Sequence, residues 1–293
     1  MSDNNLTIAI VGATGAVGAV ALDLLADRAY PAERIITMAS SRSAGKKIPY
    51  LDTELIVIEA TPDSFEGVDV AFISASADVS RALAPEAVKR GALVIDDGSA
   101  FRMDPDVPLV VPEVNGADLE WHKGIVSIPN CTTTPLAMSL AALGQANSVK
   151  RVTVATYQAV SGTGAAAVRE LDEQAGDLLA GRPVNPREYP HQIAFNVLPQ
   201  VDDFAEDGYT GEEHKMINET RKILHNAEIA ISPTCVRVPV PVTHSESVQV
   251  EFDAPMSRDE ATRLLSEFPG ITVVDDPQAS VYPMPAQASG EDE

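Results

Sequence analysis

The sequence predicts an α/β protein of two domains, with a doubly wound parallel sheet first and an α+β domain with a mostly antiparallel or mixed sheet second. Up to about residue 128, short apolar runs alternate with helical patterns, which is typical of a parallel sheet covered by helices. Beyond about Asn147, the segment Lys150–Tyr157 alternates polar and apolar residues, which indicates a sheet with one buried face. A length of 293 residues allows two cores, and we place the domains at residues 1–128 and 129–293.

Charge and composition argue against several functions. The net charge is −22, with Asp+Glu 43 against Lys+Arg 21, which argues against binding to nucleic acid or anionic membranes. The chain has neither a basic, apolar leader nor a run of ~20 apolar residues, so we expect a cytoplasmic protein outside membranes. Its two cysteines, Cys131 and Cys235, make no disulfide framework, and its histidines lack the spacing of metal ligands. We therefore expect a reducing compartment and no metal.

The first strand and the first helix enclose a glycine-rich turn. Leu6–Val11 is a continuous apolar strand, and a G-x-x-G-x-x-G pattern runs from Gly12 to Gly18 before a helix expected at about Ala16–Asp27. Glycines at such a junction let a pyrophosphate approach the backbone, and the helix N-terminus then binds it. The pattern favours a Rossmann-type dinucleotide site over a tight structural turn. The cofactor contacts expected here are Gly12, Thr14, Gly15, Ala16 and Val17.

The residues after the second strand indicate which dinucleotide binds. NAD sites usually place an acidic residue at the end of this strand, where it binds the ribose hydroxyls. After the strand Arg34–Ala39, the chain instead has Ser41, Arg42 and Ser43. Hydroxyl groups and an arginine without an acid suit a 2′-phosphate, so we predict NADP as the cofactor. A solvated basic loop is the alternative.

Further α/β units complete the first domain. Strands are expected at Leu55–Ile58, Val68–Ile73 and Ala92–Ile95, with a helix at Ser80–Arg90. Arg102 follows the last of these strands. Parallel sheets bind ligands beyond the carboxyl ends of their strands, so Arg102 is a candidate for anion binding.

Cys131 lies on the turn between a short buried strand, Gly124–Ile128, and an apolar helix, Pro135–Leu143. The threonines at 132–134 can cap free backbone N–H groups there, and the positive end of the helix dipole favours a thiolate. Unpaired cysteines are mostly buried and inert, but this polar setting argues against that reading. We therefore predict that Cys131 is a nucleophile and that Cys235 is structural.

The second domain mixes strands with longer helices. We expect helices at Ala165–Ala180, Thr210–Asn226 and Arg258–Phe268, a long excursion at Gly181–Tyr209, strands at Val236–Val242 and Ser247–Phe252, and a structureless acidic tail at Ser289–Glu293.

Six ordered motifs between Ile8 and about Gly290 resemble the bacterial branch of the aspartate-semialdehyde dehydrogenase family. The motifs are Val11–Gly18, Asp97–Arg102, Pro129–Thr133, Thr156–Gly162, Glu212–Lys215 and Arg237–Glu246. The resemblance implies an NADP-dependent acyl-phosphate dehydrogenase that interconverts aspartyl 4-phosphate and NADPH with aspartate 4-semialdehyde, phosphate and NADP. In the family this reaction serves lysine, threonine, methionine and diaminopimelate biosynthesis. The resemblance also implies a homodimer formed through the second domain.

The same resemblance assigns the site residues. Cys131 is expected to hold the substrate as a thioester, because covalent catalysis divides one difficult step into two. His244 is expected to act as general acid and base, and Gln158 to position the intermediate. Arg237 matches the arginine that binds the substrate α-carboxylate, and Glu212 matches the residue that pairs with the α-amino group. The remaining assignments are Arg102 and Lys215 for phosphate, Asn130 for the substrate, and Ser161 and Gly162 for the cofactor.

Four of these assignments have a purely structural alternative. His244 could be a surface histidine, and Arg237 could form a structural ion pair. Glu212 and Lys215 are three residues apart on a helix and could simply pair with each other. Arg237 and His244 are seven residues apart, which would place them on opposite faces of one strand, so a turn near Thr243 must redirect His244.

Two rival functions share much of this pattern. One is an N-acetylglutamyl-phosphate-type reductase on the same scaffold, and the other is a shortened, non-catalytic NADP-binding protein. Glu212 and Arg237 suit a free α-amino group and an α-carboxylate, which favours aspartyl phosphate over the first rival. The presence of both Cys131 and His244 argues against the second.

The end of the chain departs from the family. Members usually continue for several tens of residues beyond Ala286–Gly290, in a strand and a long helix that return to the nucleotide domain. We therefore expect a helix-sized apolar groove on the first domain, and weaker NADP binding than in a full-length relative.

The substitution Arg42→Ala tests the choice of cofactor. Losing a charge-assisted contact to the 2′-phosphate should raise the Kd of NADP(H) about 10- to 100-fold and leave the Kd of NAD unchanged. Fluorescence titration of both dinucleotides with the wild type and the variant gives the comparison. If the variant binds NADP(H) as the wild type does, the assignment is wrong.

Overall fold

The computed structural model describes residues 6–291 and divides the chain into two compact units. The N-terminal unit comprises the residues up to Val110 together with Gly116–Pro129. The C-terminal unit comprises Val111–Asn115 and the chain from Asn130 onward. The last two residues of the predicted acidic tail, Asp292 and Glu293, lie outside the described residues.

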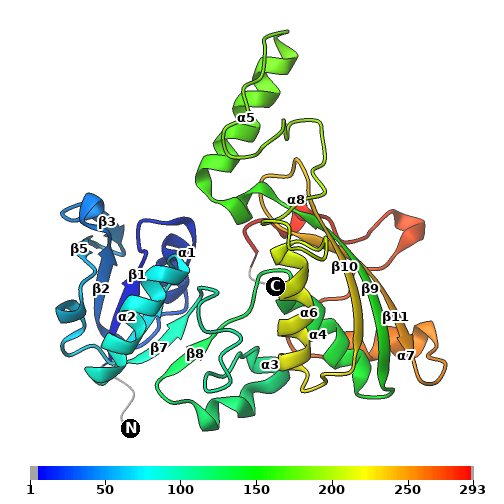
Figure 1. Ribbon diagram of the computed structural model, residues 1–293, viewed down its shortest axis with the longest axis horizontal. Helices are drawn as coiled ribbons and strands as arrows, with labels where there is room; N and C mark the ends of the chain where they lie inside the picture. Colours follow the sequence, from blue (N-terminus) through cyan, green and yellow to red (C-terminus); the bar gives the residue numbers. More distant parts are fainter. Residues whose placement is uncertain (1–5, 292–293) are drawn as a thin grey trace. The chain divides into compact units, whose positions relative to one another are not determined.

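The N-terminal unit is built on a six-stranded sheet in which every neighbouring pair is parallel. In spatial order the strands are β5 (Ile58–Glu59), β2 (Ala32–Ala39), β1 (Leu6–Val11), β6 (Val70–Ile73), β7 (Leu93–Asp96) and β8 (Ile125–Ser127) (Figure 1). The parallel sheet predicted from the sequence is confirmed. The single strand predicted at Leu55–Ile58 is wrong, because the chain there divides between β5 and a hairpin of β3 (Lys47–Tyr50) and β4 (Thr53–Ile56).

Helices pack on both faces of this sheet. Alternate residues of a strand point to opposite faces, so Ile8 and Ile10 share one face of β1 and Ala9 and Val11 the other. The first pair forms a core with Leu22 of α1 (Ala16–Asp27). The second pair lies in a core with Leu83, Ala84 and Ala87 of α2 (Ala77–Lys89). The predicted doubly wound arrangement follows from these two cores.

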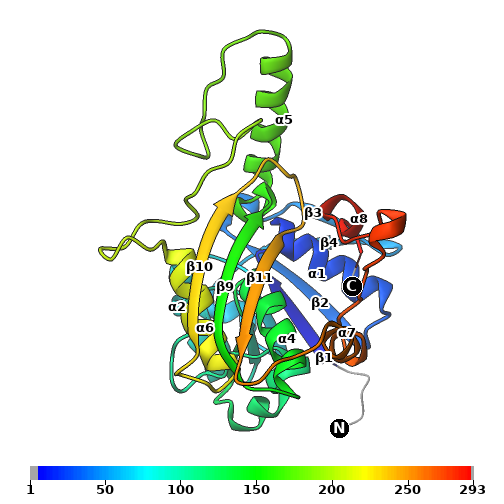
Figure 2. The same cartoon turned by 90° about the vertical axis from the view of Figure 1, so that its right-hand side faces the viewer.

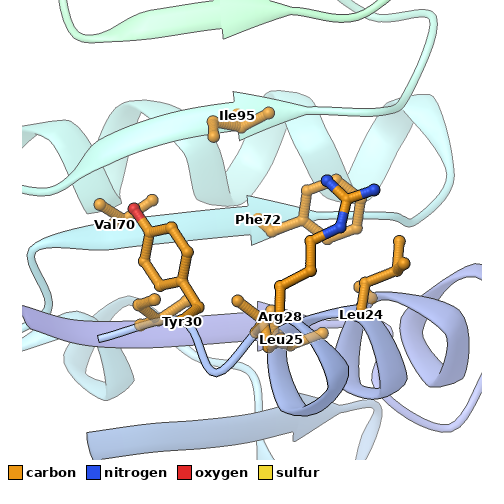
Figure 3. A pocket seen from close by; sticks show the side chains of 10 residues that line it. Leu24, Leu25, Arg28, Tyr30, Val70, Phe72 and Ile95 are labelled. Carbon is orange, nitrogen blue, oxygen red and sulfur yellow. The ribbon is translucent and has the colours of Figure 1, made fainter. Parts of the chain in front are cut away.

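An apolar cavity of about 320 Å³ lies on the α1 side of the sheet (Figure 3). Its lining residues come from α1, the following turn and three neighbouring strands, and include Leu24, Leu25, Tyr30, Val70, Phe72 and Ile95. An apolar cavity is therefore present on this domain, and a groove large enough for a helix stays a prediction.

The C-terminal unit is built on a three-stranded mixed sheet. The central strand β9 (Val149–Gln158) pairs in parallel with β10 (Ala230–Arg237) and antiparallel with β11 (Ser245–Phe252) (Figure 2). The strand predicted at Val236–Val242 is wrong beyond Arg237. Pro239 and Pro241 carry no backbone N–H, so regular strand pairing ends there, although Val240 and Pro241 still accept the backbone N–H groups of Val160 and Ser161.

One face of the mixed sheet packs against α4 (Thr133–Gly144) and α6 (Gly211–Ile223). The shared core contains Leu136 and Leu140 of α4, Met216 of α6, and Val152, Val154 and Cys235 of the sheet. The sheet thus has the single buried face that its alternating sequence predicted.

The helix α5 (Ala165–Leu179) is followed by the long irregular segment that the sequence predicted (Figure 1). Glu170 of α5 accepts hydrogen bonds from the backbone N–H groups of Arg187 and Glu188. Gln174 accepts those of Ile193 and Ala194. Two buried polar side chains of one helix therefore hold the segment.

The remaining helical elements are short, apart from α7. They are η1 (Ser41–Ser43), η2 (Pro62–Phe65), α3 (Pro112–Asn115), η3 (Gly116–Trp121), η4 (Val160–Thr163), α7 (Arg258–Glu267), η5 (Pro277–Ala279) and α8 (Pro285–Ala288). None of the helices within residues 6–291 combines the length and the apolar character that crossing a bilayer requires.

A Gly18→Ala substitution tests the packing of α1 beneath the glycine-rich turn. An added Cβ would lie 2.7 Å from the Cα of Ala13 and closer still to the carbonyl oxygen of Gly12. We expect thermal unfolding to show a loss of about 1–3 kcal/mol. The control is Gly176→Ala in α5, where the added methyl group meets nothing within 4 Å. That change should be neutral or stabilising by up to ~1 kcal/mol. Equal effects of the two substitutions would contradict this account.

Candidate active site

The glycine-rich turn is tied to the carboxyl ends of three neighbouring strands. The backbone N–H groups of Gly12 and Ala13 both donate to the carbonyl oxygen of Met38 at the end of β2. Gly12 has a φ of +89°, and an added Cβ would overlap the carbonyl oxygen of Ser74 after β6. Residues 14–17 are exposed at the N-terminus of α1. The predicted contacts Thr14, Gly15, Ala16 and Val17 thus lie on a helix N-terminus that is accessible to an anion, which fits a pyrophosphate.

The predicted 2′-phosphate residues Ser41, Arg42 and Ser43 form η1, directly after β2. Because β1 and β2 are parallel and Val11 pairs with Met38, this element and the glycine-rich turn follow the same edge of the sheet. Arg42 is exposed. This placement fits the adenosine end of a dinucleotide.

Cys131 is exposed and stands two residues before the first residue of α4. The turn around it is organised by Asn130, whose side-chain oxygen accepts hydrogen bonds from the N–H (3.0 Å) and the hydroxyl (2.6 Å) of Thr132. The sequence analysis assigned this capping role to the threonines, and the acceptor is instead the amide of Asn130. The cysteine therefore lies on a fixed turn at a helix N-terminus, as predicted.

Glu219 of α6 forms a further hydrogen bond to the same turn. Its carboxylate accepts the backbone N–H of Asn130 at 2.7 Å, and its side chain is buried in α6. The sequence analysis missed Glu219. A signal existed, because Glu212, Met216, Glu219 and Ile223 recur at helical spacing, so two acidic residues share a face with core residues.

Arg237, Gln158 and His244 lie in one row across the end of the mixed sheet. Arg237 pairs with Gln158 between β10 and β9. Ser245 pairs with Tyr157 between β11 and β9, so His244 is next to Gln158 on the other side. The two outer residues belong to different strands, so their odd spacing along the chain imposes no opposite facing. Thr243 has a φ of +75°, which marks the expected turn before His244.

Glu212 connects the mixed sheet, the turn that carries Cys131, and α6. Its Oε1 accepts hydrogen bonds from Nε2 of Gln158 (2.8 Å) and Nδ2 of Asn130 (3.1 Å). Its Oε2 accepts from Nζ of Lys215 at 3.2 Å. The pairing of Glu212 with Lys215 that the sequence left open is therefore observed, but it is only one of three contacts of this carboxylate.

Lys215 also donates to Asp202 at 2.9 Å, a contact that the sequence analysis missed. Burial alone would lower the pKa of Lys215, but the hydrogen bond to Asp202 and the attraction of Glu212 raise it above its usual value. For Asp202, burial would raise the pKa, and the bond from Lys215 leaves it lowered. Lys215 therefore stays charged between two carboxylates.

Arg237 and His244 converge on Gly162 in η4. An added Cβ on Gly162 would lie 3.0 Å from Nη1 of Arg237 and 3.2 Å from Nε2 of His244. The predicted cofactor residues Ser161 and Gly162 are thus held beside the two side chains, and the N–H of Ser161 donates to Pro241. Nη1 of Arg237 donates to the carbonyl oxygen of Ala159 at 2.7 Å. Its Nε is buried and has no hydrogen-bond partner among residues 6–291.

The protonation of His244 follows from its contacts. The backbone N–H of Ala159 donates to Nδ1 at 2.9 Å, so the neutral ring carries its proton on Nε2. Burial and, after it, the charge of Arg237 lower the pKa of His244 to about 4, against an opposing effect of Glu212. Near neutral pH the ring is therefore an uncharged Nε2–H donor.

Arg102 belongs to the N-terminal unit. Its side chain is buried, and Nη2 donates to the carbonyl oxygen of Asp97 at 2.7 Å. Its pairing with Lys215 at a phosphate group stays a prediction. Within residues 6–291, no group of three or more His, Cys, Asp and Glu side chains has the arrangement of a metal site.

A second row of the mixed sheet holds two further titratable groups. Thr156 pairs with Cys235 on β10 and with Glu246 on β11. Burial raises the pKa of the Cys235 thiol to about 12, which supports its structural role. Burial also raises the pKa of Glu246 to about 8, and its Oε1 has no hydrogen-bond partner within the described part of the chain. The sequence analysis did not single out Glu246.

Two family models match the chain. A model described as the NAD binding domain of semialdehyde dehydrogenase matches residues 7–122. A model described as the semialdehyde dehydrogenase dimerisation domain matches residues 140–293.

Individual relatives agree with the family models. The chain is 50% identical over 300 residues to the aspartate-semialdehyde dehydrogenase of Bacillus subtilis, covering 98% of this chain and 86% of that protein. It resembles the crystal structure of aspartate semialdehyde dehydrogenase II from Vibrio cholerae complexed with ASA, with a TM-score of 0.95, 38% identity and coverage of 98% and 85%. It also resembles the Candida albicans aspartate semialdehyde dehydrogenase with NADP, with a TM-score of 0.75, 25% identity and coverage of 97% and 86%.

A Glu246→Gln substitution tests the carboxyl group of this half-buried residue. In the unfolded chain this group ionises near pH 4.5, whereas in the folded protein it keeps its proton to about pH 8. Its contribution to stability is therefore fully present below pH 4.5 and is lost as the pH rises towards 8. The glutamine does not titrate, so the Tm of the variant should rise relative to that of the wild type between pH 5 and pH 8. We expect a gain of at least ~4 °C, at about 2–4 °C for each kcal/mol.

The matched control is Glu251→Gln, an exposed position on the same strand. The same chemical change at this exposed position should produce a smaller gain. A Tm difference for Glu246→Gln that does not change with pH would contradict a half-buried, protonated Glu246.

Proposed function

The chain belongs to the semialdehyde dehydrogenase family, and we propose that it interconverts L-aspartyl 4-phosphate and NADPH with L-aspartate 4-semialdehyde, phosphate and NADP. The observation that carries the proposal is the carboxylate of Glu212, which joins the turn before Cys131 to Gln158. This contact brings together a nucleophile turn, an amide that can position an acyl group, and an anion that can bind an α-ammonium group.

Cys131 is the nucleophile of the proposed reaction. Its sulfur attacks C4 of the aspartyl phosphate as a thiolate, and the C–O bond to the phosphate breaks to leave a thioester. The exposed sulfur on a turn at the N-terminus of α4 supports this role. NADPH supplies a hydride to the thioester carbon when it is bound, and the C–S bond then breaks to release the aldehyde.

His244 donates a hydrogen bond to the oxygen that becomes negative when sulfur attacks. The contact between Ala159 and Nδ1 supports this role, because it leaves the ring proton on Nε2. The general base function that the family resemblance implies requires a free lone pair on the ring. Nδ1 faces an N–H group, so the arrangement supports the donor half of the acid–base role more directly than the acceptor half.

Two charged side chains suit the amino-acid end of the substrate. Arg237 binds the α-carboxylate, and its buried Nε, which lacks a partner among residues 6–291, leaves donor capacity for it. Glu212 binds the α-ammonium group and already accepts from an ammonium group, that of Lys215. Lys215 and Arg102 bind the phosphate group, and Asn130 lies next to the reacting carbon.

The two units divide the work in this proposal. The N-terminal unit binds NADP through the glycine-rich turn and the Ser41–Ser43 element, and Ser161 and Gly162 are further proposed cofactor residues. The C-terminal unit carries the chemistry and forms a homodimer, which the match to a dimerisation-domain model supports. We assign the protein to the cytoplasm.

One assay tests the proposal. NADP reduction is followed at 340 nm with aspartate 4-semialdehyde and phosphate, for the wild type, Cys131→Ala and Cys235→Ala. The wild type should be active only with phosphate, and Cys131→Ala should lose at least ~10³-fold in kcat, because the thioester cannot form. Cys235→Ala should stay within about threefold of the wild type.

The same assay with N-acetylglutamate semialdehyde as the substrate distinguishes the proposed activity from that of an N-acetylglutamyl-phosphate-type reductase. The kcat/KM for this aldehyde should be at least ~100-fold lower than for aspartate 4-semialdehyde. Substantial activity of Cys131→Ala, or a preference for the acetylated aldehyde, would overturn the proposal.

A further inference from the structure

We propose that Thr156 is a positioning residue of this enzyme: its hydroxyl group fixes the side-chain amide of Gln158, with the NH₂ group towards Glu212. The inference rests on the proposed function, in which Gln158 positions the acyl group that Cys131 holds. Thr156 does not itself touch the reacting atoms.

Thr156 lies directly beneath Gln158. The two residues are two apart on β9, so both side chains point to the buried face of the mixed sheet. Both side chains are buried, Thr156 completely. The hydroxyl group of Thr156 is 2.9 Å from Oε1 of Gln158. Water therefore does not compete for this contact.

The direction of that hydrogen bond follows from the neighbouring groups. The carboxylate of Glu212 can only accept, so Gln158 presents its NH₂ group there, and Nε2 donates to Glu212 at 2.8 Å. Oε1 of Gln158 then faces Thr156, whose hydroxyl group donates to it. The hydroxyl oxygen of Thr156 also accepts the backbone N–H of Val236 on β10 at 3.2 Å, which holds this hydroxyl group in place.

Gln158 is not the only hydrogen-bond donor to Glu212. The same Oε1 that accepts from Gln158 also accepts from Asn130, and the other oxygen accepts from Lys215. In the proposed reaction the substrate ammonium group joins these donors. Thr156 offers Gln158 an anchor that substrate binding leaves unchanged, so the amide keeps its orientation while the contacts of Glu212 rearrange.

The experiment compares two conservative substitutions of Thr156. Thr156→Val keeps the shape and removes the hydroxyl group, whereas Thr156→Ser keeps the hydroxyl group and removes a methyl group. In the phosphate-dependent assay, Thr156→Val should lower kcat about 10- to 100-fold, because a displaced positioning group disturbs the reacting geometry. Thr156→Ser should stay within about threefold, and the KM for NADP should be unchanged in both. All rates are measured well below each variant's Tm.

A double-mutant cycle separates positioning from a general packing effect. If Thr156 acts through Gln158, Thr156→Val should have no further effect in a Gln158→Ala background. If Thr156 only supports the fold, Thr156→Val should lower kcat by the same factor in both backgrounds. The proposal is overturned by that second result, by an equal loss in Thr156→Ser, or by a wild-type kcat in Thr156→Val.

A readout independent of activity keeps this inference apart from the proposed function. The side-chain NH₂ resonances of Gln158, assigned by their loss in Gln158→Ala, should exchange slowly with solvent in the wild type and Thr156→Ser. In Thr156→Val their exchange should be at least ~10-fold faster, and unchanged exchange would contradict the role of Thr156. A wild type that is inactive with aspartate 4-semialdehyde would sink the proposed function, while this measurement would still decide whether Thr156 holds Gln158.

Discussion

The carboxylate of Glu212 is the interaction on which the arrangement of the site depends. A buried carboxylate is costly unless several donors satisfy it. Glu212 meets this condition with donors from three elements: Gln158 on β9, Asn130 before α4, and Lys215 on its own helix. The hydrogen bonds that satisfy this buried carboxylate therefore also connect the turn that carries Cys131, the central strand β9 and α6. The same helix supplies Glu219 to the backbone of Asn130, which strengthens the connection.

Local features of this protein could be predicted from the sequence, because the residues that specify them are neighbours in the chain. The strand β1 and the helix α1 have the predicted bounds, since an apolar run, a glycine-rich turn and a helical pattern follow one another directly. The turn that carries Cys131 was predicted for the same reason. The single buried face of the second sheet was predicted from the alternation along β9, a property of a single strand.

Features that depend on which strands become neighbours could not be predicted. The turn before His244 was predicted, but the order β10-β9-β11, which places Gln158 of β9 between Arg237 and His244, was not. The partial burial of Glu246 beside Thr156 also depends on this order and has no signal in the local sequence. Glu219 differs from these, because its helical spacing with Met216 was visible before the fold was known.

The charges of the site balance in a way that suits a zwitterion. Burial moves His244 and Glu246 in opposite directions on the pKa scale, and both changes leave an uncharged side chain near neutral pH. Arg237 and Lys215 then stand against Glu212 and Asp202, and the formal charges of these four side chains cancel. The amino-acid end of the proposed substrate, with one ammonium group and one carboxylate, adds no net charge to these four. In the proposed function each new charge can be matched by an exchange of partners: Glu212 would exchange Lys215 for the substrate ammonium group, which would release Lys215 to bind a phosphate group.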